Sequence, residues 1–345
     1  MSISVIDPFG VAADPAMPTC ALALDPVAVQ GQFEHRLPRL AGERGVVHLR
    51  AIRVTRYKPG RRCLVEYDVE IQRPGAPPET ATLIGKIRVR RFGKSGYHLL
   101  DALWNAGLGS DSQDGISVPE PIGTISMFRM WMQRKVPGRV ATELLAEPGG
   151  AVLARRIAEA AHKLHRAGVP AERRHTMADE VRILRQCLST VALAAPGWSG
   201  RLERILEACE RLAAATPERV RCGIHRDFYS DQVIVDGFRL YLTDFDLYCD
   251  GDPGLDVGNF LGHITEQSLR THGNPQALAD RERAMEERFV ELAGEATRPA
   301  VRTYATLTLV RHIYLSASFP DRRALTESLM DLCEQRLGIA GRVHA

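Results

Sequence analysis

The character of the sequence changes at Val136-Pro137-Gly138, and this change constrains the fold more than any other feature. After it, residues 140–214 and 276–338 carry mostly the 3.6-residue apolar period of amphipathic helices. Before it lie three runs of β-type sequence, at residues 46–57, 63–72 and 81–89. The chain has 345 residues, which is enough for two domains of about 150 residues each. We therefore predict an α+β protein with a β-rich N-terminal part and a larger helical C-terminal part.

The three β runs predict an antiparallel meander. The second run alternates strictly, with Val65, Tyr67 and their i+2 neighbours on one face. Pro59-Gly60 lies between the first two runs and suits a type II turn, because glycine accepts a positive φ. A helix at about residues 97–106 and a strand over residues 124–133 are expected to complete this part.

The N-terminal segment differs in composition and periodicity from the rest of the first half of the chain. Residues 1–24 are rich in Pro, Ala and Asp without a clear period, which predicts a loose arm. Asp25-Pro26 then provides an N-cap and a first-turn proline for a short helix to about Leu37. The expected organisation is an arm and short helix, a β-rich lobe, a hinge and a helical lobe, at residues 1–39, 40–134, 135–139 and 140–345.

Charge and cysteine usage limit the partners and the compartment. Lys and Arg number 45 against 42 Asp and Glu, a net charge of +3, which argues against a nucleic-acid or polybasic membrane partner. No run of 18 apolar residues occurs, so no membrane span is expected. The seven cysteines are widely spaced, without a C-x-x-C pair, and this favours reduced thiols. These features together predict a cytoplasmic protein.

The most informative stretch for chemistry is residues 222–256. Asp236-Gly237 is a strong hairpin-turn signal between two short apolar runs. Asp227 and Gln232 precede this hairpin, while Asp244 and Asp246 follow it. Because a hairpin brings its open ends together, we expect Asp227, Gln232 and Asp244 to converge. Such a group suits phosphoryl transfer, with Asp227 as the base and Gln232 and Asp244 as oxygen ligands for Mg²⁺.

The spacing of these residues resembles a known catalytic signature. H-x-D-x-x-x-x-N, followed by a second Asp 17 residues after the first and by D-F-x, is the signature of the protein-kinase-like fold. The version here is similar to the aminoglycoside phosphotransferase/choline kinase family of small-molecule kinases, which also has a D-x-x-x-D element, here Asp252 to Asp256. The resemblance implies a bilobal protein-kinase-like fold with a nucleotide between the lobes. It covers residues 48–320 in layout and is specific only in 222–261.

The same resemblance assigns nucleotide-binding residues to the N-terminal part. Lys86, in an apolar β run, corresponds to the strand lysine that neutralises the α- and β-phosphates. The turn at Gly60, Arg61 and Arg62 corresponds to the hairpin that covers the phosphates. Residues 134–138, with Lys135 and Val136, correspond to the hinge whose backbone binds adenine.

Three departures from the family pattern stand out. Gln232 occupies the position where the family usually has Asn, which adds one methylene to the metal ligand. The helix-C glutamate that pairs with the strand lysine is not visible, since the segment 97–104 offers only Asp101. The turn between the first two strands contains a single glycine, Gly60, so Arg61 and Arg62 either touch phosphates or are simply solvated.

Structural roles remain open for several of these residues. Asp227 and Asp244 have alternative interpretations as turn residues, Gln232 as a surface amide, and Lys86 as a side chain that snorkels from an edge strand. His162 and His165 are interpreted as ordinary helix residues rather than metal ligands. Asp252 and Asp256 are expected to be structural acceptors that hold the loop at His225.

The resulting expectation is an ATP- or GTP-dependent phosphotransferase that acts with Mg²⁺ on a hydroxyl of a small molecule. The resemblance implies aminoglycosides, choline, amino alcohols or sugars as acceptors. Five carboxylates in the helical part are candidates for binding a cationic acceptor: Glu266, Asp280, Glu282, Glu286 and Glu287. One alternative is a pseudokinase that binds nucleotide as a regulatory or scaffold protein. A protein kinase is disfavoured, because no A-P-E element occurs and seven residues separate Asp246 from Gly254.

Overall fold

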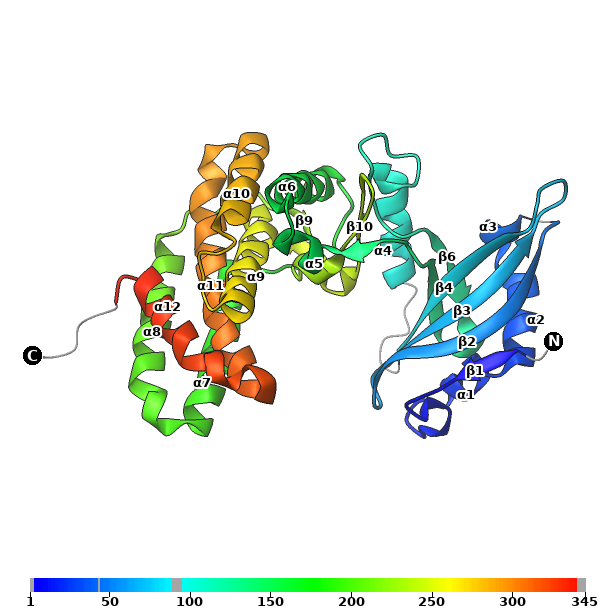
Figure 1. Cartoon of the computed structure of the whole chain (residues 1–345), viewed down its shortest axis with the longest axis horizontal. Helices are drawn as coiled ribbons and strands as arrows, with labels where there is room; N and C mark the ends of the chain where they lie inside the picture. The colour runs from blue at the N-terminus through cyan, green and yellow to red at the C-terminus, as the bar shows by residue number, and fades with distance from the viewer. Residues whose placement is uncertain (1–2, 43, 89–94, 340–345) are drawn as a thin grey trace, which may run out of the picture. The chain divides into compact units, whose positions relative to one another are not determined.

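The computed structural model describes residues 3–42, 44–88 and 95–339. The chain divides into two compact units, Met1–Pro137 and Gly138–Ala345. Figure 1 shows the first unit, built around a sheet, in blue and cyan, and the mostly helical second unit in green to red. The expected α+β division is confirmed. At the boundary, Gly138 has a φ of +111°, and a Cβ atom there would lie 2.2 Å from the Val235 carbonyl oxygen.

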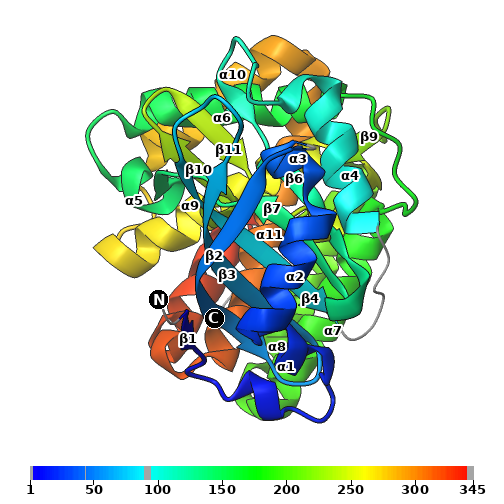
Figure 2. The same ribbon diagram turned by 90° about the vertical axis from the view of Figure 1, so that its right-hand side faces the viewer.

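The first unit contains a six-stranded sheet in the order β1-β2-β3-β4-β7-β6. The three long strands of the meander are confirmed as β2 (Val46–Lys58), β3 (Arg62–Gln72) and β4 (Glu79–Arg88), paired antiparallel. The helix after Asp25 is α2 (Pro26–Arg36), with the Asp25 carboxylate accepting from the Val27 amide at 3.0 Å. Figure 2 shows α2 in front of this sheet, where the Phe33 ring packs edge-on against Tyr67 at 5.3 Å.

The N-terminal segment is not the loose arm that its composition predicts. Residues Ser4–Ile6 form β1, which pairs parallel with β2, and Thr19–Ala23 form α1. Val11, Met17 and Cys20 are buried in the core of the first unit. The prediction failed because these apolar residues follow turns and short helical pieces, so their spacing has no single period. The helix α3 (Pro38–Ala41) completes this region.

The second half of this unit differs in detail from the predicted elements. The helix α4 (Ser95–Leu103) is confirmed, and a wider helical turn over Trp104–Leu108 continues it. The single strand predicted over residues 124–133 is wrong: β6 (Pro121–Ile125) and β7 (Met130–Arg134) form an antiparallel pair. The turn between them contains no glycine, and Arg129 takes the positive φ of +50° that glycine usually supplies. Ile116–Ser117 form the short strand β5.

The second unit consists mainly of helices. After the short strand β8 (Arg139–Val140) come α5 (Ala141–Ala146), α6 (Gly150–Arg166), α7 (Met177–Ala194) and α8 (Ser199–Ala215). The strands β9 (Cys222–Ile224), β10 (Val233–Asp236), β11 (Arg239–Leu242) and β12 (Cys249–Gly251) lie in one stretch. The unit ends with α9 (Pro253–His272), α10 (Ala279–Ala293), α11 (Arg298–Ser318) and α12 (Thr326–Arg336).

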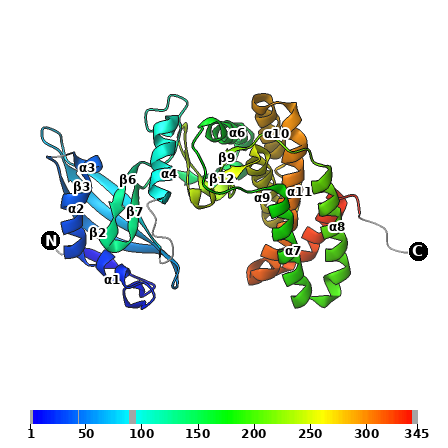
Figure 3. The ribbon, with the colours of Figure 1, turned by 180° about the vertical axis from the view of Figure 1, so that it is seen from behind.

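The close packing of α9 on α11 positions the loops of the site. Figures 1 and 3 show the two helices side by side. Gly254, Gly258 and Gly262 recur every fourth residue on α9, so they form one stripe along the helix. A Cβ atom at Gly258 would lie 2.5 Å from the Tyr304 Cβ atom on α11, so only glycine permits this approach. No helix among the described residues is both long and apolar enough to cross a membrane.

Candidate active site

The β10–β11 hairpin forms the frame of the candidate site. The two strands pair antiparallel with Val233 opposite Leu242, and Gly237 in the connecting turn has a φ of +56°. The open end of the hairpin therefore places Gln232 beside Thr243. The Thr243 amide donates to the Gln232 carbonyl oxygen at 2.9 Å, and its hydroxyl donates to the Gln232 side-chain oxygen at 3.2 Å.

Gln232 and Asp244 supply oxygen atoms at this open end. Gln232 is buried, and Asp244 follows Thr243 with a φ of +60°, a conformation that non-glycine residues rarely adopt. Amide and carboxylate oxygens fit Mg²⁺, which usually completes its shell with water and substrate phosphates. No cluster of three or more His, Cys, Asp and Glu residues that could hold a metal exists within residues 3–42, 44–88 and 95–339. The donor set thus fits a site that phosphate oxygens help to complete.

Asp227 lies in the loop before β10, and its charge affects the pKa of Tyr229 in the same loop. Burial raises the pKa of the Tyr229 hydroxyl, and the charges of Asp227, Asp231 and Asp244 raise it further, while a hydrogen bond from Gln232 acts in the opposite direction. The charges of Asp227 and Asp244 therefore both influence the Tyr229 hydroxyl. The structure brings Asp227, Gln232 and Asp244 to the same end of the hairpin.

A single buried carboxylate holds the backbone of this loop. Asp256, near the start of α9, accepts hydrogen bonds from the His225 amide at 2.8 Å and from the Arg226 amide at 2.7 Å. Its Oδ2 atom also contacts the His165 Nε2 atom of α6 at 2.9 Å. Arg226 is held in the left-handed region with a φ of +70°. The expected structural role of Asp256 is confirmed, and Asp252 accepts from the Gly254 amide at 2.8 Å as the cap of α9.

His225 connects the same loop to the metal-ligand end of the hairpin. Its ring is fully buried and packs against Phe245 at 4.9 Å between centroids. The His225 Nε2 atom lies 2.8 Å from the Thr243 carbonyl oxygen. Because a carbonyl only accepts, Nε2 carries the proton in this contact. The loop of Asp227 and the residue before Asp244 are thereby tied together.

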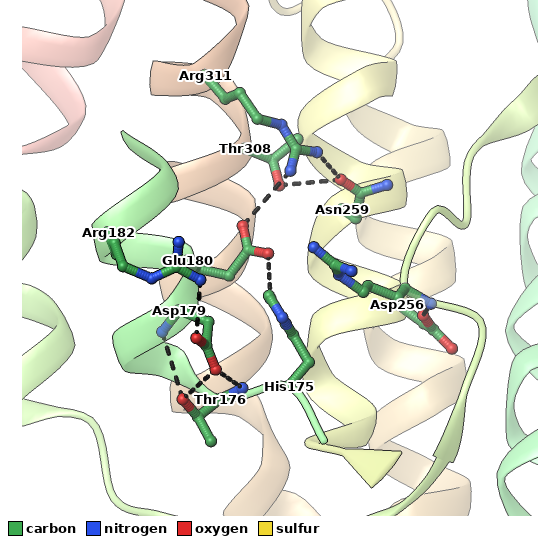
Figure 4. Close-up of polar contacts among 10 residues, drawn as sticks. His175, Thr176, Asp179, Glu180, Arg182, Asp256, Asn259, Thr308 and Arg311 are labelled. Carbon is green, nitrogen blue, oxygen red and sulfur yellow. Dashed lines mark hydrogen bonds and ion pairs between the residues drawn. The ribbon is translucent and has the colours of Figure 1, made fainter. Parts of the chain in front are cut away.

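A second set of contacts reaches the loop from α7 and α11 (Figure 4). The Asn259 amide donates to the Phe228 carbonyl oxygen at 2.9 Å, and its own side-chain oxygen accepts from Arg311 at 2.6 Å. Arg311 also donates to Glu180 at 3.4 Å, and Glu180 contacts the His175 Nε2 atom at 2.6 Å. Together these contacts form a continuous polar network from the start of α7 to the residue after Asp227.

The charge of Glu180 is stabilised inside this network. Burial alone raises the pKa of the Glu180 carboxyl, but the hydrogen bond to His175 and the positive charges of Arg311 and Arg226 outweigh burial, so its pKa is lowered. A buried carboxylate is tolerated when it is paired and hydrogen-bonded in this way. Glu180 is therefore ionised at neutral pH.

The sequence-predicted lysine of the first unit lies in the middle of the sheet. Lys86 on β4 is opposite Leu64 on β3 and opposite Trp131 on β7. Its ammonium lies 4.7 Å from the centroid of the Trp131 ring. Asp101, the one acid in the corresponding helix, forms an ion pair with Arg39.

The turn between β2 and β3 is fixed by a carboxylate from the N-terminal segment. Gly60 has the positive φ of +60° that the turn requires, and the Arg61 amide donates to the Lys58 carbonyl oxygen at 3.0 Å. Asp14 accepts from the Gly60 amide at 3.1 Å and from the Tyr57 hydroxyl at 2.6 Å. The predicted turn is thus confirmed.

The turn between β2 and β3 also carries a concentration of positive charge. The charge of Arg62 lowers the pKa of Lys58 most, burial lowers it next, and Arg56 and Arg61 lower it further. Like charges that disfavour one another in this way attract an anion such as a phosphate.

The segment predicted to contact adenine begins at the end of β7. The Lys135 amide donates to the Thr82 carbonyl oxygen at 2.8 Å, so this donor is already used. The Lys135 ammonium pairs with Glu66 at 2.7 Å, and Arg53 contacts the other oxygen of Glu66 at 3.2 Å. Val136 follows directly, before the boundary between the units.

Several residues of the site were not identified from the sequence. Asn259 lies three residues after Asp256, one helical turn further along the same face of α9, so this spacing could have revealed it. Glu180 and Arg311 lie far from the loop in the sequence, and neither is part of a recognisable sequence motif. Tyr229 lies inside the motif but at a position that the pattern leaves free.

Comparisons with known proteins support this description of the fold. Residues 96–302, more than half of the chain, match the model of the phosphotransferase enzyme family. A choline/ethanolamine kinase family protein from Mesorhizobium loti shares 17% identity and a TM-score of 0.56, over 90% of this chain and 93% of that chain. A thermostable aminoglycoside phosphotransferase mutant, solved with ADP and hygromycin B, shares 16% identity and a TM-score of 0.53, over 85% and 95%.

A glucosamine kinase shares 14% identity and a TM-score of 0.51, over 74% of each chain. No curated protein sequence matches the chain. At these identities the similarity to solved structures establishes the fold, which is the expected protein-kinase-like one. The family match covers the hairpin with Asp227, Gln232 and Asp244, and the chain therefore belongs to the phosphotransferase enzyme family.

Proposed function

We propose that this protein transfers the γ-phosphoryl group of ATP or GTP to a hydroxyl group of a small molecule, in the cytoplasm. The acceptor oxygen forms a bond to the γ-phosphorus as the bond from that phosphorus to the β,γ-bridging oxygen breaks. The hydroxyl proton passes to the Asp227 carboxylate. The observation that carries the proposal is the convergence of Asp227, Gln232 and Asp244 at one end of the β10–β11 hairpin. Seven free cysteines suit a reducing compartment.

The residues of the second unit have distinct roles in this proposal. Asp227 orients the acceptor hydroxyl and takes its proton. Gln232 and Asp244 would hold Mg²⁺, which when bound supplies positive charge to the phosphate oxygens. Asp256 and Asn259 are positioning residues, because they contact only the backbone of the loop. Correct placement is decisive in phosphoryl transfer, where the protein contributes mainly orientation and charge.

The residues of the first unit bind the nucleotide. Lys86 contacts the phosphates, and the turn with Gly60, Arg61 and Arg62 adds positive charge toward them. The Lys135 amide is committed to Thr82, so the adenine contacts of this segment are assigned to the Lys135 carbonyl and to Val136. Residues 135–139 are the proposed hinge.

The test is ADP formation by the purified protein with Mg²⁺ and ATP or GTP. Aminoglycosides, amino alcohols and sugars are offered as acceptors, and the product is identified by its added phosphate mass. Acceptor-dependent ADP formation supports the proposal. Nucleotide that neither binds nor is consumed contradicts it.

A pseudokinase remains the second candidate. Gln232 in place of the usual Asn and the pairing of Asp101 with Arg39 favour it. It predicts that Mg²⁺ and ATP raise the melting temperature while no ADP forms with any acceptor. The same assay therefore separates the two functions.

A further inference from the structure

We propose that the N-terminal segment, residues 4–24, holds the β2–β3 turn in position for the phosphates of the nucleotide, and that Asp14 is the positioning residue through which it does so. The inference rests on the proposed function, which assigns phosphate binding to the turn with Gly60, Arg61 and Arg62. It deepens that function by adding a residue that acts through the turn rather than by contact with the nucleotide.

The Asp14 carboxylate joins the N-terminal segment to the turn directly. Its Oδ2 atom accepts from the Tyr57 hydroxyl of β2 at 2.6 Å and from the Gly60 amide of the turn at 3.1 Å. Its Oδ1 atom accepts from the Ala16 amide of its own segment at 2.8 Å. The hydrogen bonds from Tyr57, Gly60 and Ala16 lower the pKa of Asp14 against a smaller opposing effect of burial, so this group is ionised at neutral pH. Hydrogen bonds to an ionised acceptor are stronger than those between neutral groups.

The segment that carries Asp14 is itself fixed to the rest of the first unit. β1 pairs parallel with β2. Val11 and Met17, three residues before and three after Asp14, are buried in the core of the first unit. Cys20 of α1 and Cys63 of β3 are buried in the same core. Asp14 is therefore a fixed anchor for the turn rather than part of a freely moving arm.

The Asp14 contact lies on the face of the sheet that does not carry Lys86. Tyr57 is opposite Cys63 in the pairing of β2 and β3, and Lys86 is opposite Leu64 in the pairing of β3 and β4. Directly opposed residues share a face, whereas the successive residues Cys63 and Leu64 point to opposite faces. Tyr57 and Lys86 therefore lie on different faces. Asp14 supports the hairpin from behind, with respect to the lysine that is proposed to contact the phosphates.

Fixing the turn in advance should matter because the turn is rich in like charges. The charge of Arg62 lowers the pKa of Lys58 most, and the charges of Arg56 and Arg61 add to this effect. These groups repel one another, whereas phosphate binding requires them to be held together. A carboxylate that bonds to the middle of the turn removes part of this ordering cost before the nucleotide binds, and preorganisation of this kind increases affinity.

The test measures the dissociation constant of Mg²⁺-ATP by calorimetry for the wild type and three variants. Asp14→Ala removes both contacts to the turn and should raise this constant about tenfold, the scale of one hydrogen bond to a charged group. Asp14→Asn keeps a side-chain oxygen for the Tyr57 hydroxyl and the Gly60 amide, so its constant should stay within about threefold of the wild type. Tyr57→Phe loses one of the two contacts and should lie between the wild type and Asp14→Ala.

Asp7→Ala is the matched control. Asp7 is a partly exposed carboxylate of the same segment, as Asp14 is. It accepts from the Phe9 amide at 3.3 Å and from the Ala12 amide at 3.1 Å, both within the N-terminal segment. Its replacement removes a comparable set of contacts but leaves Gly60 bonded to Asp14. The dissociation constant of Mg²⁺-ATP should therefore equal that of the wild type.

Adenosine, which has no phosphate, separates a positioning role from a general structural one. Its affinity is measured by displacement of mant-ATP, a fluorescent ATP analogue. Because the turn is proposed to contact the phosphates, Asp14→Ala should leave the dissociation constant of adenosine unchanged while that of ATP rises. An equal loss for ATP and adenosine would mean that the segment supports the first unit as a whole, and it would overturn the inference.

The other outcomes separate this inference from the proposed function. Equal or tighter ATP binding by Asp14→Ala, or an equal loss in Asp7→Ala, overturns the inference while the phosphotransferase stands. If Asp14→Ala does not fold, Tyr57→Phe decides. ATP binding that is weaker in Tyr57→Phe than in Asp7→Ala upholds the inference, and equal binding overturns it. A wild-type protein that binds neither ATP nor GTP would defeat the proposed function, and the inference with it.

Discussion

The side-chain amide of Asn259 donates a hydrogen bond of 2.9 Å to the carbonyl oxygen of Phe228, the residue that follows Asp227. Asn259 is fully buried on α9, and Thr308 and Arg311 donate to its side-chain oxygen at 3.2 and 2.6 Å. The amide therefore cannot turn around, because its oxygen is fixed by two donors. This contact transfers the rigidity of α9 and α11 to the loop that carries the proposed base.

Replacing Asn259 should affect the chemical step more than nucleotide binding. Asn259→Ala leaves the Phe228 carbonyl and Arg311 without this partner, so the loop shifts relative to the acceptor. We expect kcat to fall about 100-fold, the scale of an ångström-sized misplacement. The dissociation constant of ATP, measured by calorimetry, should be unchanged. An Asn259→Ala protein that folds normally and keeps its kcat would show that the contact has no positioning role.

The buried Asp256 carboxylate should be essential for stability. Asp256→Asn replaces an acceptor of three contacts with an amide whose NH₂ group faces donors from His225, Arg226 or His165. We expect the free energy of unfolding, from urea denaturation, to fall by about 3 kcal/mol. Asp250→Asn is the control, since Asp250 is partly exposed and pairs with Arg221. Equal stability of the two variants would contradict the anchoring role.

Replacing the proposed metal ligand Gln232 should change the dependence of activity on Mg²⁺ concentration. Gln232→Ala removes a side-chain oxygen at the open end of the hairpin and should raise the Mg²⁺ concentration for half-maximal activity at least about tenfold, the scale for lost partners at metal sites. Gln232→Asn retains an amide oxygen and should shift this concentration less. The dependence is measured at saturating ATP. Identical Mg²⁺ dependence of the wild type and Gln232→Ala would remove Gln232 from the site.

The buried His312 should make the free energy of unfolding decrease in acid. Burial, followed by the charges of Arg311, Arg322 and Arg270, lowers the pKa of this histidine to about 3. Because the folded pKa lies below the unfolded value of about 6.5, the unfolded chain binds more protons in acid. The stability from the neutral ring is present above pH 6.5 and is lost as the pH falls from 6.5 toward 3.

At pH 5 this effect should amount to about 2 kcal/mol. Denaturant unfolding at pH 7 and pH 5 measures it, and His312→Gln should reduce the difference between the two pH values by that amount. His272→Gln replaces an exposed histidine and should leave the difference unchanged. A pH dependence that is the same in both variants would exclude His312 as the source.

The sequence predictions are correct where a feature depends on residues that are close together in the sequence. The β2–β3 turn and the β10–β11 hairpin rest on local signals, Pro59-Gly60 and Asp236-Gly237, and both are confirmed. The role of Asp256 was expected from its place in the D-x-x-x-D element, where the helix geometry of α9 directs it toward the loop.

Other features depend on contacts between distant segments. Glu180 and Arg311 meet only because α7 packs against α11, and Asp14 reaches Gly60 only through the folded N-terminal segment. The β6–β7 turn was missed because Arg129 adopts a glycine-like conformation that its identity does not indicate. Local sequence patterns do not contain the information that determines these tertiary contacts and this backbone conformation.

The most direct test of the account is the turnover of Asp227→Asn. The wild type, Asp227→Asn and Asp231→Asn are compared for ADP formation with Mg²⁺, ATP and the best acceptor. Asp231 is an exposed carboxylate of the same loop, bonded to Thr142, and its variant controls for the lost charge. We predict that Asp227→Asn lowers kcat about 1,000-fold, as expected for a lost general base, and still binds ATP, while Asp231→Asn remains active. Wild-type turnover by a folded Asp227→Asn protein would contradict the assignment of the base.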